Sequence, residues 1–458
     1  MEIYIRNRNR DVIGMIDNYE SLIWTPRYYE PGDFEVYTRA TEESVSLLKL
    51  DNYVMKPDSD MVGIIESVQI TTHPEEGDYI IAKGRCAKSI LERRILWGLS
   101  GADNITVELA IRKFVSENIV SPAMSARKID HFVLGELRGF TEKITAQYTG
   151  DNLLEVVVNL CKQYGIGFKV VLNDDGDFEL QLYKGEDRSY NQTVNSWVVF
   201  SPEFENIMSS DYSHDKSTLK NACLIAGEGE ALSRDYTFIG LTRGLDRREL
   251  FVDARDVTSE TEGGEKLSTS DYYNLLEERG CEELAENLQT ITFEGEVESS
   301  RQFVFGRDYN LGDIVTVKNQ YGITVHPRVI EVIQSHDENG LTVIPTFSTV
   351  GEVVTTILDN QVIELDEEGW GEVEVFSPLI DGEEYTVIFN GKEYMTTATT
   401  MTVEPYGTGI ALGNKAIFGG EDTGENFIIG YARSWIAVIA WDDSTKVTLS
   451  IIGPTIKT

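Results

Sequence analysis

The chain has 458 residues, of which 77 are acidic and 40 are basic, so its formal net charge is −37. This length suffices for two to four domains at roughly 100 to 200 residues each, every one with its own core. Hydrophobic residues make up 41% and aromatic residues 10%, which argues against a disordered chain and predicts a soluble globular protein. A balance this acidic repels phosphate backbones and anionic lipid headgroups, so we expect no sequence-specific binding of nucleic acid.

The sequence indicates no targeting segment, membrane span or disulfide framework. Arg6, Arg8 and Arg10 are not followed by the continuous apolar run of a signal peptide. The longest apolar run, residues 435–441, has seven residues, against the roughly 20 that a membrane span requires. The cysteines lie far apart and form no CxxC pair, so we expect small buried side chains rather than disulfides or zinc ligands. They are Cys86, Cys161, Cys223 and Cys281.

Charge is distributed unevenly along the chain. Residues 1–150 carry 18 basic and 23 acidic side chains, residues 151–350 carry 17 and 36, and residues 351–458 carry 5 and 18. Because the last segment is almost free of Lys and Arg, we place a domain boundary near residue 350.

Two hairpins are predicted in the first half of the chain. Residues 61–70 and 79–86 are β-branched runs separated by a turn rich in Pro, Gly and acidic residues. Residues 167–173 and 177–183 flank an Asp-Gly turn that ends at Gly176. Most of the chain therefore reads as strands.

A three-strand meander is predicted nearer residue 350. Its strands are expected at residues 311–319, 323–335 and 341–347, separated by short polar turns. Pro327 and Pro345 cannot donate a backbone hydrogen bond, so we expect them at sheet edges or bulges.

Three helices interrupt the strands. Apolar residues recur at helical spacing in residues 106–118, with Thr106 as the cap. The second helix is expected at residues 151–164, with an acidic cap at Asp151, and the third at residues 270–288. The apolar side of the third helix comprises Tyr273, Leu276, Leu284 and Leu288. The predicted fold class is α+β, predominantly β.

Residues 353–458 are predicted to form a separate all-β module. Residues 385–389 and 392–396 bracket Asn390 and Gly391, a strong hairpin signal. Further strands are expected at residues 427–432, 434–441 and 446–452. About 105 residues with closely spaced strands predict a small, sandwich-like module.

No motif for catalysis, a cofactor or a metal stands out. The five histidines form no HExxH pair, and the sequence has no GxSxG elbow, no Walker loop and no GxGxxG after a strand. We therefore assign no catalytic, cofactor-binding or metal-binding residue and expect no enzyme. A glycosidase-type pair of carboxylates remains an alternative. The two residues need only be close in space, and the sequence does not show which two of the 77 acidic residues would be.

Three local patterns have a structural and a functional interpretation. Asp174, Asp175 and Asp177 favour a turn over a calcium loop, since the Glu at position 12 of an EF-hand is missing. Residues 419–427 favour an ordinary acidic turn over a sugar-binding or calcium-binding loop. A cluster of aromatic residues near the N-terminus favours core packing over a stacking platform. The cluster contains Trp24, Tyr28, Tyr29, Phe34 and Tyr37.

Six stretches in order resemble the tail-tip or baseplate hub proteins of siphophages, the family that includes the N-terminal domain of tail-associated lysins. The resemblance covers roughly residues 1–350. The stretches are WTPRYYEPGDFEVYTRA (24–40), GIIESVQITTHPEEGDYIIAKGRCAKSILERRI (63–95), GDNLLEVVVNLCKQYGIGFKV (150–170), LDRRELFVDARDV (245–257), the helix at 270–288, and YNLGDIVTVKNQYGITVHPRVIEVI (309–333).

The resemblance implies a homotrimeric hub in a phage tail. Each chain would contribute two barrel-like subdomains, at roughly residues 1–200 and 201–350, so three chains present six similar units to a hexameric tail tube. The hub would form part of a DNA channel whose acidic wall offers no cations to phosphates. Implied partners are further copies of the chain, distal tail and tail tube proteins, the tape measure protein, and tip or fibre proteins. The implied location is the virion.

The role of residues 351–458 stays open. Lysin activity is not implied, because the module lacks a Cys-His or zinc-ligand pattern. One alternative function is binding of host cell-wall glycan or another receptor through aromatic side chains of the module, and another is a cell-wall hydrolase. The candidate glycan or partner contacts are Trp370, Tyr406, Trp435 and Trp441.

Overall fold

The computed structural model describes residues 2–350 apart from positions 74, 76, 208–210, 231–232, 241–243, 262–263, 289, 295–302 and 339, and the strands of residues 353–456. The chain divides into two compact units. The first contains residues 1–144, 148–215 and 289–350, and the second contains residues 145–147, 216–288 and 351–458. The chain is predominantly β with a few helices, which confirms the predicted fold class.

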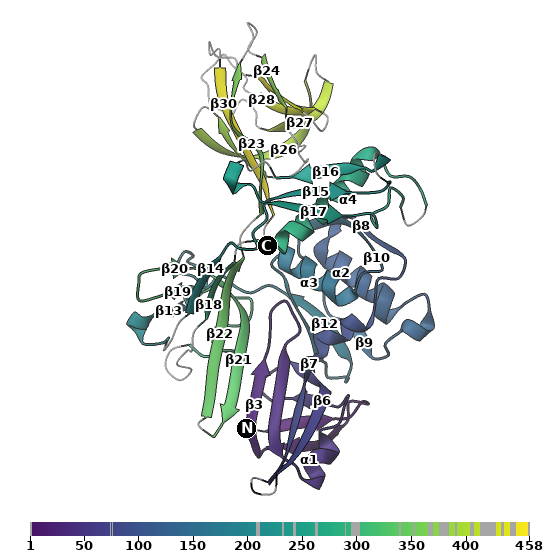
Figure 1. The fold of residues 1–458 in the computed structure, drawn as a ribbon, viewed down its shortest axis with the longest axis vertical. Coiled ribbons are helices and arrows are strands. Elements are labelled where there is room, and N and C mark those ends of the chain that lie inside the picture. The colour runs from purple at the N-terminus through teal and green to yellow at the C-terminus, as the bar shows by residue number, and fades with distance from the viewer. Residues whose placement is uncertain are drawn as a thin grey trace. The chain divides into compact units, whose positions relative to one another are not determined.

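An antiparallel sheet of eleven strands dominates the first unit (Figure 1). In spatial order its strands are β14 (Asp211–Asp215), β18 (Thr290–Glu294), β22 (Gly340–Val350), β21 (Arg328–Asp337), β3 (Tyr19–Thr25), β4 (Asp33–Arg39), β7 (Gly77–Cys86), β6 (Val62–His73), β5 (Tyr53–Met55), β1 (Ile3–Arg6) and β2 (Val12–Ile16). The short helix α1 (Glu42–Leu47) follows β4 and begins with a capping box at Thr41.

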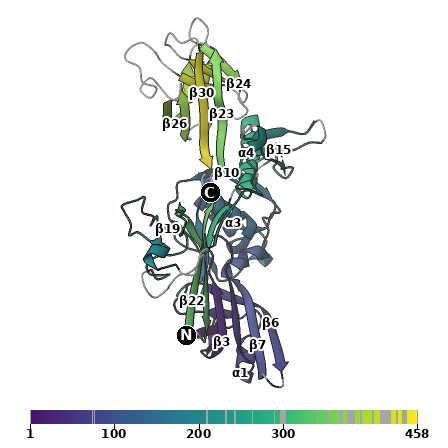
Figure 2. The same cartoon turned by 60° about the vertical axis from the view of Figure 1, so that its left-hand side comes forward.

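Two halves of this sheet repeat one topology. Each half has four strands in the spatial order first, second, fourth, third: β3-β4-β7-β6 and β14-β18-β22-β21. Each ends in a long hairpin whose first strand carries a bulge, after Ile65 in β6 and after Val329 in β21. The halves meet where β21 pairs with β3, and Figure 2 shows β22 and β3 together in this sheet.

The repeat extends to the side chains. When the two bulges and the strand registers are aligned, Trp24 and Phe34 of the first half correspond to Tyr212 and Phe293 of the second. The Trp24 and Phe34 rings lie 5.8 Å apart, and the Tyr212 and Phe293 rings lie 6.1 Å apart. Each half also has a separate hydrophobic core, the first within residues 3–86 and the second within residues 198–347.

Helices and short strands inserted between the halves complete the first unit. α2 (Val107–Val115) begins at Thr106 as predicted, and its last residues continue as a π-helical turn. α3 (Leu153–Gln163) ends before Gly165, whose φ of +61° favours glycine. The remaining elements are the 3₁₀ helix η1 (Ala87–Arg93) and the strands β8 (Leu99–Thr106), β9 (Phe132–Leu134), β10 (Lys143–Thr149), β11 (Gly167–Leu172), β12 (Phe178–Tyr183), β13 (Val199–Phe200), β19 (Thr316–Lys318) and β20 (Thr324–Val325).

Both predicted hairpins are confirmed. β6 pairs with β7, and β11 pairs with β12, each antiparallel. The first hairpin is longer than expected, because Thr71 and Thr72 continue the β-branched pattern of β6.

The predicted meander is wrong in its connectivity. The expected strand at residues 323–335 is divided at Pro327 into β20 and β21, because Pro has no backbone N–H to continue a ladder. β19 and β20 form a separate small sheet with β13, while β21 and β22 join the large sheet. Pro345 pairs with Val332 of β21 and lies one residue beyond the described part of β22 that pairs with β18.

Two details of the helices also differ from the prediction. The cap of α3 is Asn152, whose Oδ1 accepts the backbone N–H of Leu154 at 2.9 Å, while Asp151 accepts the N–H of Thr149. On α4 (Thr269–Ala285), Leu276 and Leu284 are buried as predicted, but Tyr272 takes the buried position that was expected for Tyr273.

The second unit contains a three-stranded sheet that packs against α4. The strands are β16 (Tyr236–Ile239), β15 (Ala222–Ala226) and β17 (Glu249–Asp253), in that order. Gly280 allows α4 to approach β15 closely, since a Cβ there would lie 2.7 Å from the Ile225 side chain.

The described residues between 353 and 456 in the second unit form eight strands. Their order is β23 (Val353–Glu364), β30 (Lys446–Ile456), β25 (Glu384–Phe389), β26 (Lys392–Val403), β27 (Gly407–Leu412), β28 (Phe427–Tyr431), β29 (Trp435–Ile439) and β24 (Trp370–Glu374). The hairpin expected between β25 and β26 is confirmed. β26 pairs with β25 through its first half and with β27 through its second, as strands do at the corner of a sandwich.

Candidate functional site

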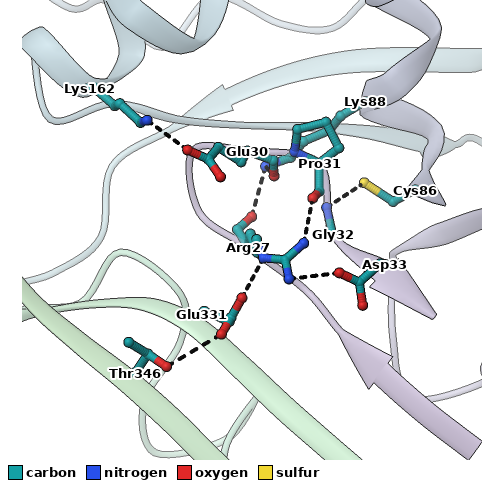
Figure 3. A network of polar contacts seen from close by, with 10 residues as sticks. All are labelled: Arg27, Glu30, Pro31, Gly32, Asp33, Cys86, Lys88, Lys162, Glu331 and Thr346. Atoms are coloured by element: carbon teal, nitrogen blue, oxygen red, sulfur yellow. Dashed lines mark hydrogen bonds and ion pairs between the residues drawn. The ribbon is translucent and has the colours of Figure 1, made fainter. Parts of the chain in front are cut away.

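The loop between β3 and β4 holds a network of hydrogen bonds and ion pairs that reaches several other segments of the first unit (Figure 3). Arg27 forms an ion pair with Asp33 at 2.7 Å and donates to the carbonyl of Pro31 at 2.9 Å. Arg27 also forms an ion pair with Glu331 on β21, and Glu331 accepts a hydrogen bond from Thr346 on β22. One guanidinium therefore ties the first half of the sheet to the hairpin of the second half.

Lys88, on the 3₁₀ helix η1, holds this loop by hydrogen bonds to its backbone. Its ammonium group donates to the backbone carbonyls of Arg27, Tyr28 and Glu30 at 2.8, 3.0 and 3.1 Å, and lies 4.5 Å from the centre of the Phe168 ring. Burial of the charged group lowers the pKa of Lys88 to about 8. Three carbonyls occupy all three donors of the ammonium, so its chemistry is structural.

Glu30 joins the same loop to α3. Its carboxylate pairs with Lys162 at 2.7 Å. Burial alone would raise the pKa of Glu30, but the hydrogen bond and charge of Lys162 outweigh it and hold that pKa below the ordinary value.

Tyr28 lies where three segments of the first unit converge. Its hydroxyl donates to the carbonyl of Gly165 at 3.0 Å, and its backbone N–H donates to the carbonyl of Ile330 at 2.8 Å. Its ring covers Gly167 and Gly312, where a Cβ would lie 2.1 and 2.3 Å from ring carbons. Only glycine fits at these two positions, so the aromatic ring fixes the spacing between the segments.

A cavity of about 450 Å³ opens beside Lys88. Its charged lining is paired within the protein: Lys169 forms an ion pair with Asp60, and Arg188 pairs with Asp313 at 2.9 Å. Burial raises the pKa of the Cys86 thiol that also lines it, which disfavours the nucleophilic thiolate. The arrangement provides a rigid, ion-paired joint and does not resemble a nucleophile activated by a base.

The four aromatic residues proposed as glycan or partner contacts are only partly located. Trp370 and Trp435 lie on the paired strands β24 and β29. Trp435 pairs with Glu374, four residues along β24 from Trp370, which separates the two positions by about 14 Å along the strand. Tyr406 and Trp441 lie outside the described residues, as does most of the 419–427 loop. Their role stays a prediction.

The interpretation of the acidic segment around Gly176 as a turn is confirmed. Asn173 accepts the backbone N–H groups of Asp175 and Asp177, so the acidic segment is a hairpin turn. Within the described residues, no group of three His, Cys, Asp or Glu side chains is placed to hold a metal ion. Cys86, Cys161 and Cys223 are buried, and Cys281 is half-buried.

The aromatic cluster near the N-terminus packs as expected. Trp24, Tyr28, Tyr29 and Phe34 are buried, and Tyr37 stacks on Tyr79 with ring centres 5.0 Å apart.

Sequence reasoning missed the charged members of the joint. Lys88 follows a buried strand within an otherwise apolar segment, and Glu331 stands between Ile330 and Val332 in a strand. A charge inside an apolar run is a signal for a buried partner, but the sequence does not say that Arg27, 304 residues away, is that partner. Among the described residues, no helix is long and apolar enough to cross a bilayer.

Comparisons with known proteins point to phage tails. Residues 2–348 match the family model of the Siphovirus ReqiPepy6 Gp37-like protein. No curated protein matches the sequence. Solved structures that match this chain include a tail protein from Neisseria meningitidis MC58. The two are 14% identical with a TM-score of 0.47, and the match covers 76% of this chain and 96% of that one.

Two further structures have similar values. The 43 kDa tail protein of prophage MuSo2 from Shewanella oneidensis is 12% identical with a TM-score of 0.48, covering 76% of this chain and 98% of that one. The prophage tail protein gp18 from Listeria monocytogenes EGD-e is 10% identical with a TM-score of 0.43, covering 76% and 94%. On the strength of the family match, which spans three quarters of its length, the chain belongs to the Siphovirus ReqiPepy6 Gp37-like family of phage tail proteins.

Proposed function

We propose that the chain is a structural, non-enzymatic hub of a siphophage tail tip. Three copies form a ring that joins a hexameric tail tube to a threefold tip and lines part of the DNA channel. The tail tube and distal tail proteins, the tape measure protein, and tip or fibre proteins are then its partners in the virion. Membership of a phage tail family supports this role.

The observation that carries the proposal is the repeated four-strand topology. Within one chain, the third strand of one half (β21) pairs with the first strand of the other (β3). If the same pairing is applied to the third strand of the first half, β6 of one copy pairs with β14, the first strand of the second half, in the next copy. Beyond Ile65, no described strand pairs with the outer edge of β6, and the outer edge of β14 is likewise unpaired among the described strands. β6 of one copy and β14 of the next therefore offer the junction that closes a ring.

Three chains joined in this way present six similar four-strand units. This is the symmetry that a threefold hub needs to match a sixfold tube. The acidic composition is compatible with a channel that releases DNA, since 77 acidic against 40 basic residues offer phosphates few partners.

The register of the ring junction follows from the repeat. At the junction within the chain, Ser335 pairs with Ile23. Aligned on the bulges and strand registers, Ser335 corresponds to Thr71 and Ile23 corresponds to Asp211. We therefore expect Thr71 of one copy opposite Asp211 of the next, at the Cα separation of about 4.5 to 5.5 Å that a disulfide accepts.

The test is a pair of cysteines at these positions. Native mass spectrometry of the full chain should show a species three times the 51.5 kDa of one chain. Under oxidising conditions the Thr71→Cys, Asp211→Cys double variant should give covalent trimers, while either single variant should not. A protein that stays monomeric across the concentration range would overturn the hub.

An assay of peptidoglycan hydrolysis tests the proposal that the chain is not an enzyme. The purified chain should release no soluble fragments from host peptidoglycan, and lysis that is lost in an acid-to-amide variant would instead favour the hydrolase alternative.

A further inference from the structure

Two arginines of the helical insertion lie close together. Arg94 follows η1, and Arg127 ends the short 3₁₀ turn η3 (Ser125–Arg127). Arg94 Nε donates to the backbone carbonyl of Arg127 at 2.7 Å, and Arg127 Nη2 donates to the backbone carbonyl of Ile95 at 2.6 Å. Each guanidinium therefore binds the backbone of the segment that carries the other, which brings two positive charges together.

The Arg127 side chain is held in one place. Its Nη2 also donates to Oδ1 of the buried Asn118 at 2.9 Å, and the same oxygen accepts the backbone N–H of Trp97 at 3.3 Å. The Trp97 ring lies against the guanidinium, with 4.8 Å between the ring centre and Cζ of Arg127. A side chain that is fixed before binding loses little entropy when a partner arrives.

Three nitrogens of the two guanidinium groups remain available. Arg94 Nη1 donates to the carbonyl of Arg93 at 2.8 Å, which leaves Arg94 Nη2 and the Nε and Nη1 of Arg127 without a hydrogen-bond partner among the described residues. The buried side-chain atoms that lack a partner belong to other residues, so these nitrogens face solvent. Hydrogen bonds from a guanidinium to an anionic oxygen are about twice as strong as neutral ones, so the pair is suited to bind an oxyanion.

The charges of the two arginines are not offset within the described part of the chain. Hydrogen bonds to neighbouring carboxylates raise the pKa of Arg85 and of Arg307. In contrast, burial and the charge of Arg93 lower the pKa of Arg94, and burial and the charge of Arg94 lower the pKa of Arg127. The pair is therefore a local positive site in a chain whose net charge is −37.

Acidic residues close to the pair in sequence are bound to other groups. Asp151 accepts the backbone N–H of Thr149 at 2.9 Å. Three others form ion pairs with other basic residues, at 2.7, 3.5 and 3.6 Å: Glu92 with Arg85, Glu117 with Lys113, and Asp130 with Lys128. An incoming anion therefore does not have to displace any of these carboxylates from Arg94 or Arg127.

The same two segments carry exposed apolar side chains. Trp97 is 61% exposed, Met124 is 54% exposed and Ile95 is 44% exposed. Tryptophan and arginine are the residues that most often dominate the energy of a protein interface. A ligand that combines carboxylates with an apolar side chain can use both kinds of group.

A short acidic peptide fits this chemistry better than a nucleic acid does. Double-stranded DNA carries one negative charge per about 1.7 Å of its axis, and a chain with 77 acidic residues repels so dense a charge. A peptide with a few carboxylates brings little charge beyond what two arginines can bind. A phosphate backbone also has no apolar side chain to place on Trp97.

We propose that Arg94, Arg127 and Trp97 form a docking site for an acidic peptide segment of another tail protein, in which an apolar residue stands between carboxylates. The carboxylates accept hydrogen bonds from the available guanidinium nitrogens, and the apolar residue packs on Trp97. This site goes beyond the proposed hub and does not depend on how many copies the hub contains.

Binding of a defined peptide to the full chain tests the proposal. The probe is a fluorescein-labelled heptapeptide with Leu between two pairs of Glu, followed by fluorescence anisotropy at about 50 mM salt. A control peptide with Gln in place of every Glu should not bind, and about 500 mM salt should weaken the acidic peptide severalfold.

Variants test which residues hold the peptide. Arg94→Gln, Arg127→Gln and Trp97→Ala should each raise the dissociation constant about tenfold. The matched control is Arg307→Gln, which removes the same charge from an exposed arginine that is paired with Asp308 and should leave the dissociation constant unchanged.

Photo-cross-linking locates the site in the unaltered chain, so it does not depend on the folding of any variant. A peptide with benzoyl-phenylalanine in place of Leu should label residues 94–97 or 122–128, with the exposed Met124 as the expected position. An excess of unlabelled acidic peptide should block the labelling, whereas the Gln peptide should not.

The outcomes that overturn the inference differ from those that overturn the hub. Equal binding of the acidic and Gln peptides, unchanged binding by the Arg94 and Arg127 variants, or cross-links confined to other segments would refute the docking site. Displacement of the peptide by a DNA duplex of about 20 base pairs at a lower concentration than the unlabelled peptide would show a phosphate site instead. The threefold association of the chain, which tests the hub, is measured separately.

Discussion

The ring of Tyr28 lies against the α-carbon of Gly167, so close that a Cβ at Gly167 would stand 2.1 Å from a ring carbon. These residues are 139 positions apart, and their contact sets the distance between the β3–β4 loop and β11.

Gly167→Ala should destabilise the fold by about 1 to 3 kcal/mol, because the added methyl group forces the buried ring or the strand to move. Urea denaturation followed by circular dichroism measures the free energy of unfolding. In a Tyr28→Ala background the same glycine substitution should cost far less, and equal costs in both backgrounds would refute a direct steric coupling.

Arg27→Met should lower the free energy of unfolding by about 2 to 4 kcal/mol, since it leaves Glu331 and Asp33 without their cation in a partly buried site. The matched control is Arg8→Met, which breaks an ion pair with Asp51 between exposed side chains and should cost below about 1 kcal/mol. Denaturation of both variants under the same conditions provides the comparison, and similar losses would contradict the role assigned to Arg27.

Stability should fall as the pH drops below about 6.5. Burial and the charge of Lys56 lower the pKa of His336, which lies where β21 meets β3. A base with a depressed pKa binds its proton more readily in the unfolded chain, so acid favours unfolding, and this loss of stability begins at the unfolded pKa near 6.5. Denaturation between pH 7.5 and 5.5 should show a shallower pH dependence for His336→Gln, and an unchanged slope would contradict the assignment.

The four thiols should resist alkylation in the folded protein. Burial raises the pKa of Cys161 and of Cys223 to about 12, and it raises the pKa of Cys86 and Cys281 as well. Iodoacetamide at pH 8 should therefore modify fewer than one thiol per chain, and all four after unfolding in guanidinium chloride. Rapid labelling of the native chain at Cys161 would show that α3 opens.

Local chemistry in the sequence determined the elements whose signals are contained in a few neighbouring residues. The Asp-Gly and Asn-Gly turns fixed the hairpins at β11–β12 and β25–β26, and helical periodicity located α2, α3 and α4. The cluster from Trp24 to Phe34 was predicted to be core because large aromatic side chains usually pack in the interior of a protein.

Tertiary structure decided what depends on partners far apart in the chain. Only the fold shows that Pro327 diverts a strand into another sheet, that Lys88 binds three carbonyls, and that Arg27 meets Glu331. The repeat of β3-β4-β7-β6 as β14-β18-β22-β21 is likewise invisible in the residues, because strand order is set by long-range pairing and buried positions accept any apolar side chain of suitable volume.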